Sequence, residues 1–282
     1  MLLVVVVLMG VLGAIVGGMY VAQRSLIYHP SPGPLPSASD VLPGGEDVTL
    51  HTSDGLALSA WFFPANGSAN DAGTDGAADA ETSPVVLVAQ GNGGNRGGRV
   101  DLARALTRHD ISVLLFDYRG YGGNQGDPTE DGLARDVRAA YGYLVSERDV
   151  PRERLFYFGE SLGSGVVSEL ATEHPPAGML LRSPFPDLAA VGSEHYPWLP
   201  VRLLLKDRYP VADNVSALDD VPMVVVYGTD DSIVPPALSE QVAAAADMRR
   251  VAVEGAGHND RVLLDGPELI GALVELVAST TR

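Results

Sequence analysis

Six runs of apolar, largely β-branched residues alternate along the chain with segments of helical periodicity. The runs are VVLVAQG (85–91), ISVLLFDYRG (111–120), RLFYFGES (154–161), GMLLRSP (178–184), PMVVVYGTDD (222–231) and RRVAVEGAGH (249–258). Amphipathic segments lie between most of them, for example at 100–109 and 130–147. Continuous apolar strands that alternate with helices predict an α/β fold, with a mostly parallel sheet covered on both faces. Such sheets bind ligands at the carboxyl ends of their strands, so functional residues are expected there.

Two further segments precede the first of these runs. Residues 47–65 hold alternating apolar positions on both sides of Asp54-Gly55, which predicts a β-hairpin. Residues 66–83 are small and acidic and contain no large apolar side chain. We interpret 66–83 as a flexible surface loop inside one domain rather than as a domain boundary.

The first 22 residues form a separate segment without a charged side chain. At about 1.5 Å per residue a helix of this length spans roughly 30 Å, the hydrocarbon thickness of a bilayer. We therefore expect a transmembrane anchor over 1–23, followed by an extended tether over the Pro- and Gly-rich residues 24–46. A cleaved signal peptide and a buried core helix are the alternatives. Arg24 is the first charge and does not fix the orientation, so the prediction is a single-pass membrane protein of open sidedness.

Composition excludes several classes of function. The chain has 36 acidic and 19 basic residues, a net charge of −17, and this charge would repel the phosphates of a nucleic acid. It has no cysteine, so a disulfide scaffold, a thiolate metal site and a cysteine nucleophile are excluded. The single lysine, Lys206, does not lie in a P-loop motif, and Arg96 breaks the dinucleotide-binding pattern that begins at Gly91. We therefore expect no cofactor and no metal ion.

The segment Gly159-Glu160-Ser161-Leu162-Gly163 closes one predicted strand and opens the apolar segment after it. A G-x-S-x-G sequence in this context is typical of a nucleophile elbow, a strained turn whose small flanking residues let strand and helix approach closely. An ordinary glycine-rich turn is the alternative. The first interpretation makes Ser161 the nucleophile, and the backbone N–H of Leu162 one donor of an oxyanion hole.

A serine nucleophile needs a base, and the base needs an acid that orients it. Among the six histidines only His258 directly follows a late strand, and the chain order Ser…Asp…His then fits an acyl-transfer site. The acid is expected after the preceding strand, where both Asp230 and Asp231 are available. A second oxyanion donor is expected from the glycine-rich loop 90–95.

With these motifs in place, the chain resembles serine-type α/β-hydrolases. It is most similar to a single-pass membrane subgroup related to the ABHD-type and bud-emergence-type hydrolases, with a serine aminopeptidase-like domain. The resemblance runs from QRSLIYHP (23–30) nearly to the C-terminus. It includes GNGGN (91–95), FDYRGYG (116–122), GDPTEDGLARD (126–136), GESLGSG (159–165), SPFPDL (183–188), YPWLPVRLLLKDRY (196–209), GTDDSIVP (228–235) and GAGHND (255–260).

The resemblance adds two site residues and shows two departures. It assigns the acid to Asp231, the fourth position of G-x-x-D-x-x-V-P, and the second oxyanion donor to the backbone N–H of Asn92. Gln90 stands where the family usually has His, and Asn124 stands where a Ser often follows the RGYG run.

The resemblance also implies an α/β-hydrolase fold over 47–282, with a short lid over 185–218 and one transmembrane helix before it. The expected function is hydrolysis of an ester or thioester bond in a small-molecule or lipid-like acyl substrate. Ser161, His258 and Asp231 would act through an acyl-enzyme. An aminopeptidase-like amidase, an acyltransferase, and a catalytically silent, membrane-tethered binding protein are the alternatives.

Overall fold

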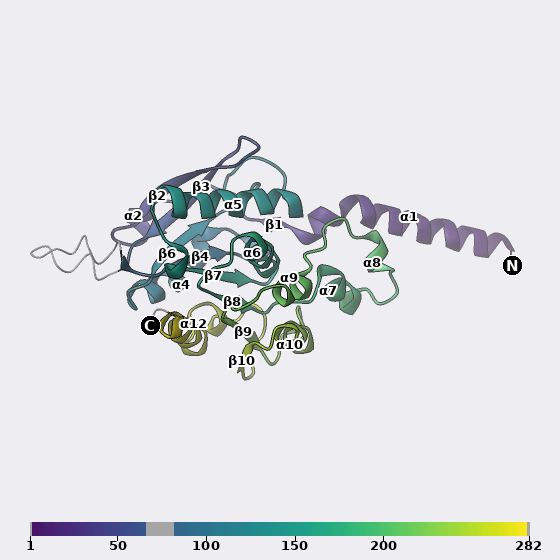
Figure 1. The fold of residues 1–282 in the computed structure, drawn as a ribbon. Coiled ribbons are helices and arrows are strands. Elements are labelled where there is room, and N and C mark those ends of the chain that lie inside the picture. Colours follow the sequence, from purple (N-terminus) through teal and green to yellow (C-terminus); the bar gives the residue numbers. More distant parts are fainter. Residues whose placement is uncertain (1, 66–81, 281–282) are drawn as a thin grey trace, which may run out of the picture.

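The computed structural model describes residues 2–65 and 82–280. Within them an eight-stranded sheet has the order β10-β9-β8-β7-β4-β6-β3-β2, and the two-residue strands β1 and β5 form a separate pair (Figure 1). The strands are β1 (His29–Pro30), β2 (Glu46–His51), β3 (Ala57–Phe63), β4 (Val85–Ala89), β5 (Gly93–Gly94), β6 (Ser112–Phe116), β7 (Leu155–Glu160), β8 (Gly178–Arg182), β9 (Met223–Gly228) and β10 (Arg249–Val253).

The helices vary in length from one turn to seven. The α-helices are α1 (Leu2–Ile27), α2 (Ala38–Val41), α4 (Val100–Thr107), α5 (Glu130–Ser146), α6 (Leu162–Glu173), α7 (Leu188–His195), α8 (Val201–Leu204), α9 (Val211–Ser216), α10 (Pro236–Ala245), α11 (Val262–Asp265) and α12 (Pro267–Thr280). Two short 3₁₀ segments, η2 (Arg96–Arg99) and η3 (Arg152–Arg154), precede α4 and β7.

The predicted α/β fold with a mostly parallel sheet is confirmed. Every neighbouring pair from β10 to β6 is parallel, and each of the six apolar runs contains one of these strands. The predicted hairpin is formed by β2 and β3, which pair antiparallel to each other, while β3 also pairs antiparallel to β6. Gly55 lies in the turn with φ of 89°, a conformation that glycine adopts without strain.

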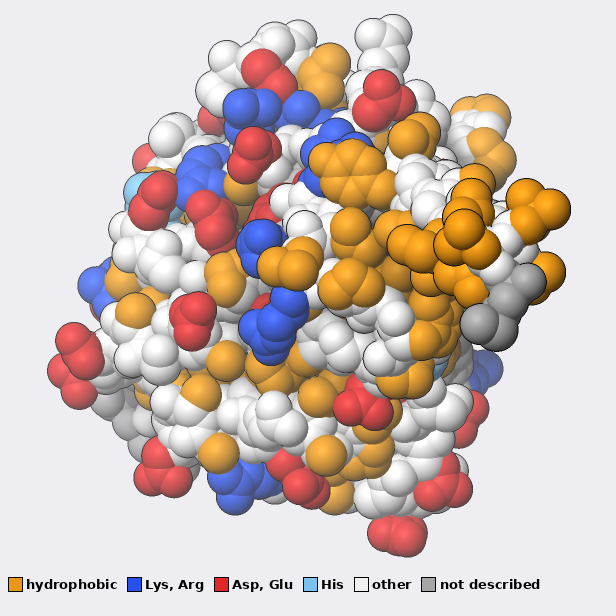
Figure 2. Space-filling model, turned by 90° about the vertical axis from the view of Figure 1, so that its right-hand side faces the viewer, with side chains coloured by type: hydrophobic (Ala, Val, Ile, Leu, Met, Phe, Trp, Pro, Cys, Tyr) orange, Lys and Arg blue, Asp and Glu red, His pale blue; other side chains and the backbone are white. Residues whose placement is uncertain are grey.

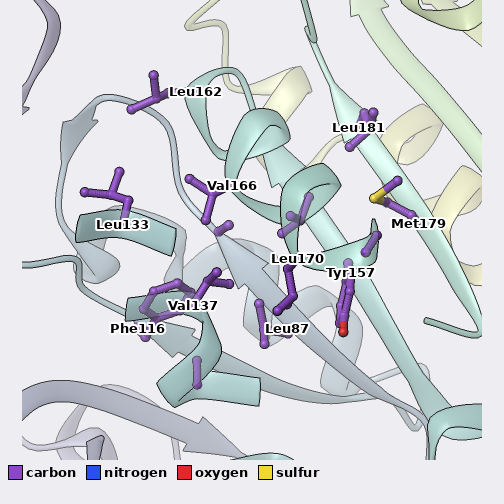
Figure 3. Packing of buried hydrophobic residues seen from close by; sticks show 14 of the residues in the cluster. Leu87, Phe116, Leu133, Val137, Tyr157, Leu162, Val166, Leu170, Met179 and Leu181 are labelled. Atoms are coloured by element: carbon purple, nitrogen blue, oxygen red, sulfur yellow. The ribbon is translucent and has the colours of Figure 1, made fainter. Parts of the chain in front are cut away.

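The parallel strands are apolar throughout because both faces of the sheet are covered. In β4, Leu87 and Ala89 face one buried cluster, and Val86 and Val88 face another. Side chains of α5, α6, α9 and α10 complete the first cluster, and those of α2, α4, α11 and α12 complete the second. Figure 3 shows the first cluster, in which α5 and α6 pack on the central strands. Because β4, β7, β8, β9 and β10 run parallel, their carboxyl ends lie at one edge of the sheet.

Helix α1 ends four residues beyond the predicted anchor 1–23, since it continues to Ile27. Its most apolar stretch has a mean hydropathy of 2.7, no part of that stretch is buried, and the helix is long and apolar enough to cross a membrane. This exposure rules out the alternative that α1 is a core helix of the domain. Figure 1 shows α1 projecting from the domain beside α8.

Residues 24–46 do not form the extended tether that their composition predicts. Strand β1 pairs with β5, the Ser31 N–H donates to the Gly94 carbonyl, and Ala38 is fully buried. The glycines of this segment permit that docking, because a Cβ at Gly33 would lie 2.5 Å from the carbonyl oxygen of Gly122. The segment therefore belongs to the domain surface. Of the predicted loop 66–83, residues 66–81 lie outside the described residues.

Candidate active site

Ser161 lies in a strained turn between β7 and α6. Its φ of 51° and ψ of −113° are unusual for a residue with a side chain, and such strain is found at sites where the surrounding structure enforces it. A Cβ at Gly159 would approach the Ser164 Cα to 2.7 Å, and a Cβ at Gly163 would overlap the carbonyl oxygen of Ala89. The two glycines are thus required for the strand and the helix to meet this closely.

The structure brings Ser161, His258 and Asp231 together at the carboxyl edge of the sheet. His258 Nε2 lies 3.1 Å from Ser161 Oγ, and His258 Nδ1 lies 2.6 Å from Asp231 Oδ2. All three residues are buried, although they come from loops after three different strands. The order hydroxyl, imidazole, carboxylate is the geometry that lets a base accept the hydroxyl proton.

Asp231 is held by more than His258. Its Oδ1 atom accepts hydrogen bonds from the backbone N–H groups of Ile233 at 2.9 Å and Val234 at 2.8 Å. Burial acts to raise the pKa of Asp231, but the contact with His258 and these two N–H donors outweigh it, and the pKa lies below its usual value. Asp230, the other carboxylate that the sequence offered, is exposed.

The two residues predicted to supply oxyanion donors line the same cavity as Ser161. Leu162 is the first residue of α6, so its N–H has no partner within the helix. Two hydrogen bonds to the Asn92 carbonyl hold its backbone in place. The carbonyl accepts from the His29 N–H at 2.8 Å and from the Tyr121 hydroxyl at 2.7 Å. Both backbone positions therefore lie at the cavity that contains Ser161, where the sequence predicts an oxyanion hole.

The two departures from the family pattern lie beside this loop. Gln90 Nε2 donates to Asp117 at 3.0 Å, and its buried Oε1 accepts no hydrogen bond among the described residues. The Asn124 side chain accepts from the Ser59 N–H at 3.0 Å and donates to the Asp117 carbonyl at 2.8 Å. Asn124 therefore ties a turn to β3, a role that leaves the cavity unaffected.

A buried charge network beneath Ser161 is absent from the sequence prediction. Glu160, directly before the serine, receives two hydrogen bonds from Arg99, at 2.7 and 2.9 Å, and lies 3.0 Å from Arg182. The sequence does contain a signal for this network. Glu160 and Arg182 are charged residues in otherwise apolar strands, and a buried charge needs a buried partner.

The network joins the three backbone segments of the site. Arg99 also donates to the carbonyls of Gly93 and Asn95 in the loop that carries Asn92. Arg182 donates to the backbone carbonyl of His258. One cluster of charges thus contacts the loop, the serine turn and the histidine. Burial acts to raise the pKa of the Glu160 carboxyl, but the two guanidinium groups lower it to about 2.

Replacing Glu160 by glutamine is expected to destabilise the protein strongly. The change leaves Arg99 and Arg182 buried without a counter-charge, and breaking a buried pair in this way costs about 3 kcal/mol. The matched control is Glu173→Gln, which removes an exposed partner of Arg138 and is expected to cost less than about 1 kcal/mol. Urea unfolding measures both free energies, and equal losses would contradict the role of the network.

The pH dependence of the unfolding free energy, compared between the original protein and Glu160→Gln, tests the charge of Glu160. The folded-state pKa of Glu160 lies below the ordinary value of 4.5, so its carboxylate stabilises the fold above about pH 4.5. That stabilisation is lost as the pH falls toward 2. The difference in unfolding free energy between the original protein and Glu160→Gln should therefore shrink over this interval.

Nothing in the described part of the chain forms a group of three or more His, Asp or Glu side chains able to hold a metal ion. The six histidines are separated, and His195, which also lines the cavity, places its Nε2 2.9 Å from the carbonyl of Ile233. The chemistry that the described side chains offer is therefore that of a hydroxyl, an imidazole and a carboxylate.

Comparisons with known proteins agree with this chemistry. Residues 80–217 match the family described as serine aminopeptidase, S33. An uncharacterized protein of Mycobacterium tuberculosis is 50% identical over 260 residues, which cover 92% of this chain and 88% of that protein. The lysophosphatidylserine lipase ABHD12 of Danio rerio is 29% identical over 217 residues, covering 68% of this chain and 56% of the lipase.

Among solved structures, the Pyrococcus furiosus esterase Pf2001 is similar with a TM-score of 0.67 and 18% identity. The similarity covers 91% of this chain and 98% of the esterase. At this identity the likeness concerns the fold alone. The family match and the similarity to the lipase support hydrolase activity.

Proposed function

The chain belongs to the α/β-hydrolases, in the family described as serine aminopeptidase, S33, and from that premise we propose that it is a serine hydrolase of acyl esters or thioesters. One observation carries the proposal: the hydrogen-bonded series Ser161, His258, Asp231 on a strained elbow that lines a cavity. The lipase and esterase among its relatives favour ester chemistry.

The proposed reaction has two halves. His258 Nε2 accepts the Ser161 hydroxyl proton while Oγ forms a bond to the substrate carbonyl carbon, and the N–H groups of Asn92 and Leu162 stabilise the resulting oxyanion. The tetrahedral intermediate collapses, the bond to the leaving alcohol or thiol breaks, and His258 gives that group its proton. Water then adds to the acyl-enzyme by the same steps and releases the carboxylic acid. Asp231 holds the Nδ1–H tautomer throughout.

Labelling with a fluorophosphonate probe tests the nucleophile. Ser161 is expected to carry the phosphonyl group in the full-length protein, as read by mass spectrometry of the labelled peptide. A protein that folds but takes no label would be the silent, membrane-tethered binding protein that the sequence leaves as an alternative.

Amide hydrolysis is the second candidate, because the matched family is described as serine aminopeptidase. A p-nitrophenyl ester and the matched p-nitroanilide separate the two activities, since they share the acyl group. We expect the ester to have the higher kcat/KM. A higher value for the anilide would favour the amidase.

We further propose that α1 remains attached and anchors the protein in a membrane. A cut after residue 24 would remove Arg24, whose guanidinium donates to the buried Asp207 at 3.0 and 3.2 Å. A cut after residue 30 would also remove the strand β1 and the Tyr28 hydroxyl, which lies 2.8 Å from the Tyr209 hydroxyl. A segment with this many contacts to the domain is a poor candidate for a cleaved signal peptide.

Carbonate washing tests the anchor. A membrane-spanning helix resists high pH and salt, whereas a peripheral protein is released, so the full-length protein should require detergent for extraction. Its N-terminal peptide should be present in the mass spectrum. A soluble mature protein that begins near residue 23–30 would contradict the anchor and leave the hydrolase proposal intact.

A further inference from the structure

The cavity that contains Ser161 has a volume of about 470 Å³ and a mostly apolar lining. Residues of α7 and α8, represented by Val191 and Leu204, line it. The end of α1 also lines it and contributes Met19, Leu26 and Ile27. The helix proposed to cross the membrane is therefore also a wall of the cavity.

Polar contacts fix this wall against the lid segment. Gln23 is buried, its Nε2 donates to the Leu204 carbonyl at 3.2 Å, and its Oε1 accepts from the Lys206 N–H at 2.8 Å. The salt bridge between Arg24 and the buried Asp207 adds a second attachment one residue later. A polar side chain at the end of so apolar a helix is explained by this docking.

The same helix end is attached to the proposed oxyanion loop. Asn92 Nδ2 donates to the carbonyl of Ile27 at 2.8 Å. Asn92 and Ile27 both line the cavity, so the wall and the reacting atoms form one connected structure.

Exposed hydrophobic side chains surround the same region. Tyr196, Trp198 and Leu203 of the lid segment are exposed, Trp198 by 56% and Leu203 by 83%, and Ile233 is exposed by 42%. Figure 2 looks onto the side of the molecule from which α1 projects, and hydrophobic side chains gather there in one area. Tyr196 and Ile233 also line the cavity, so this apolar surface is continuous with its interior. Aromatic residues beside a spanning helix are typical of a protein surface at the lipid interface.

We propose that this cavity binds the acyl chain of a membrane-resident ester or thioester, and that residues 19–27 of α1 set the length of chain it accepts. The chain enters from the lipid along the exposed hydrophobic surface, and its carbonyl meets Ser161. The inference rests on the proposed serine-hydrolase function and adds the substrate class. When kcat/KM is referred to the concentration of substrate in water, each methylene that the cavity takes up increases it by up to about fourfold, until the cavity is filled.

Filling the cavity from α1 tests this assignment. The full-length protein in phosphatidylcholine vesicles is given p-nitrophenyl acetate and p-nitrophenyl decanoate. We expect a higher kcat/KM for the decanoate in the original protein, and Leu26→Trp should lower the decanoate-to-acetate ratio about tenfold. Val191→Trp fills the same cavity from α7 and should act in the same direction. The control is Val21→Trp on the same helix, because Val21 is 78% exposed and does not line the cavity.

Each outcome of this experiment either supports or overturns the acyl-chain site. An unchanged ratio in Leu26→Trp and Val191→Trp would overturn the acyl-chain site, and so would an equal fall in Val21→Trp or a parallel loss of both substrates. An original protein that prefers acetate would overturn it as well. In these cases continued turnover of acetate, together with probe labelling of Ser161, would leave the proposed hydrolase function standing. Failure of turnover and labelling would refute that function instead.

Discussion

Replacing Ser161 by alanine is expected to lower kcat for a p-nitrophenyl ester by about 10³-fold or more. The substitution removes the oxygen that is proposed to form the acyl-enzyme, while the proposed oxyanion donors and the cavity are unchanged. Steady-state kinetics measure the loss, and circular dichroism checks that the fold is retained.

Ser164→Ala is the matched control within the same motif. Its hydroxyl donates to the Gly159 carbonyl at 3.1 Å and does not contact His258, so a loss of no more than a few-fold is expected. If Ser161→Ala kept the activity of the original protein, the assignment of the nucleophile would be wrong.

Replacing Asp231 by asparagine is expected to lower kcat on the order of 10³- to 10⁴-fold. The asparagine oxygen can still accept from the N–H groups of Ile233 and Val234, and its amide group then faces His258. A donor there favours the wrong imidazole tautomer and no longer stabilises the imidazolium that forms during the reaction.

Asp230→Asn makes the same chemical change one position earlier, on an exposed side chain, and should alter kcat by less than about threefold. The two variants can be compared in one assay because neither changes the size of the side chain. A reversal of the two effects would show that the acid is one residue earlier than proposed.

Most of the fold follows from local pattern. The apolar runs at 85–91 and 154–161 each carry a strand that is buried on both faces, and burial on both faces is what removes polar alternation from a strand. The position of His258 also follows, because the carboxyl ends of parallel strands share one edge of the sheet. The contact between Ser161 and His258 could therefore be anticipated from the residues alone, whereas the choice of Asp231 over Asp230 needed the resemblance to known hydrolases.

The charge network and the docking of residues 24–46 on the domain could not be predicted, for two different reasons. Glu160 lies 61 residues after Arg99 and 22 residues before Arg182. The local sequence around each residue does not indicate which partner neutralises its charge. Residues 24–46 have the Pro and Gly content of a linker, and the same residues also permit close docking of backbone on backbone. Composition does not distinguish these two outcomes.

The continuity of α1 from Leu2 to Ile27 has a geometric consequence, if the helix lies in lipid as proposed. The helix passes from its exposed apolar part to the hydrogen bond with Asn92 without an intervening joint. A single helix then sets the height of Ser161 above the bilayer. Its rotation about its own axis sets the direction in which the cavity opens. Each residue inserted near Gly13 would lift the domain by about 1.5 Å and turn it by about 100° relative to the outer part of the helix. In such a molecule the number of residues in the anchor determines how the domain is oriented on the membrane.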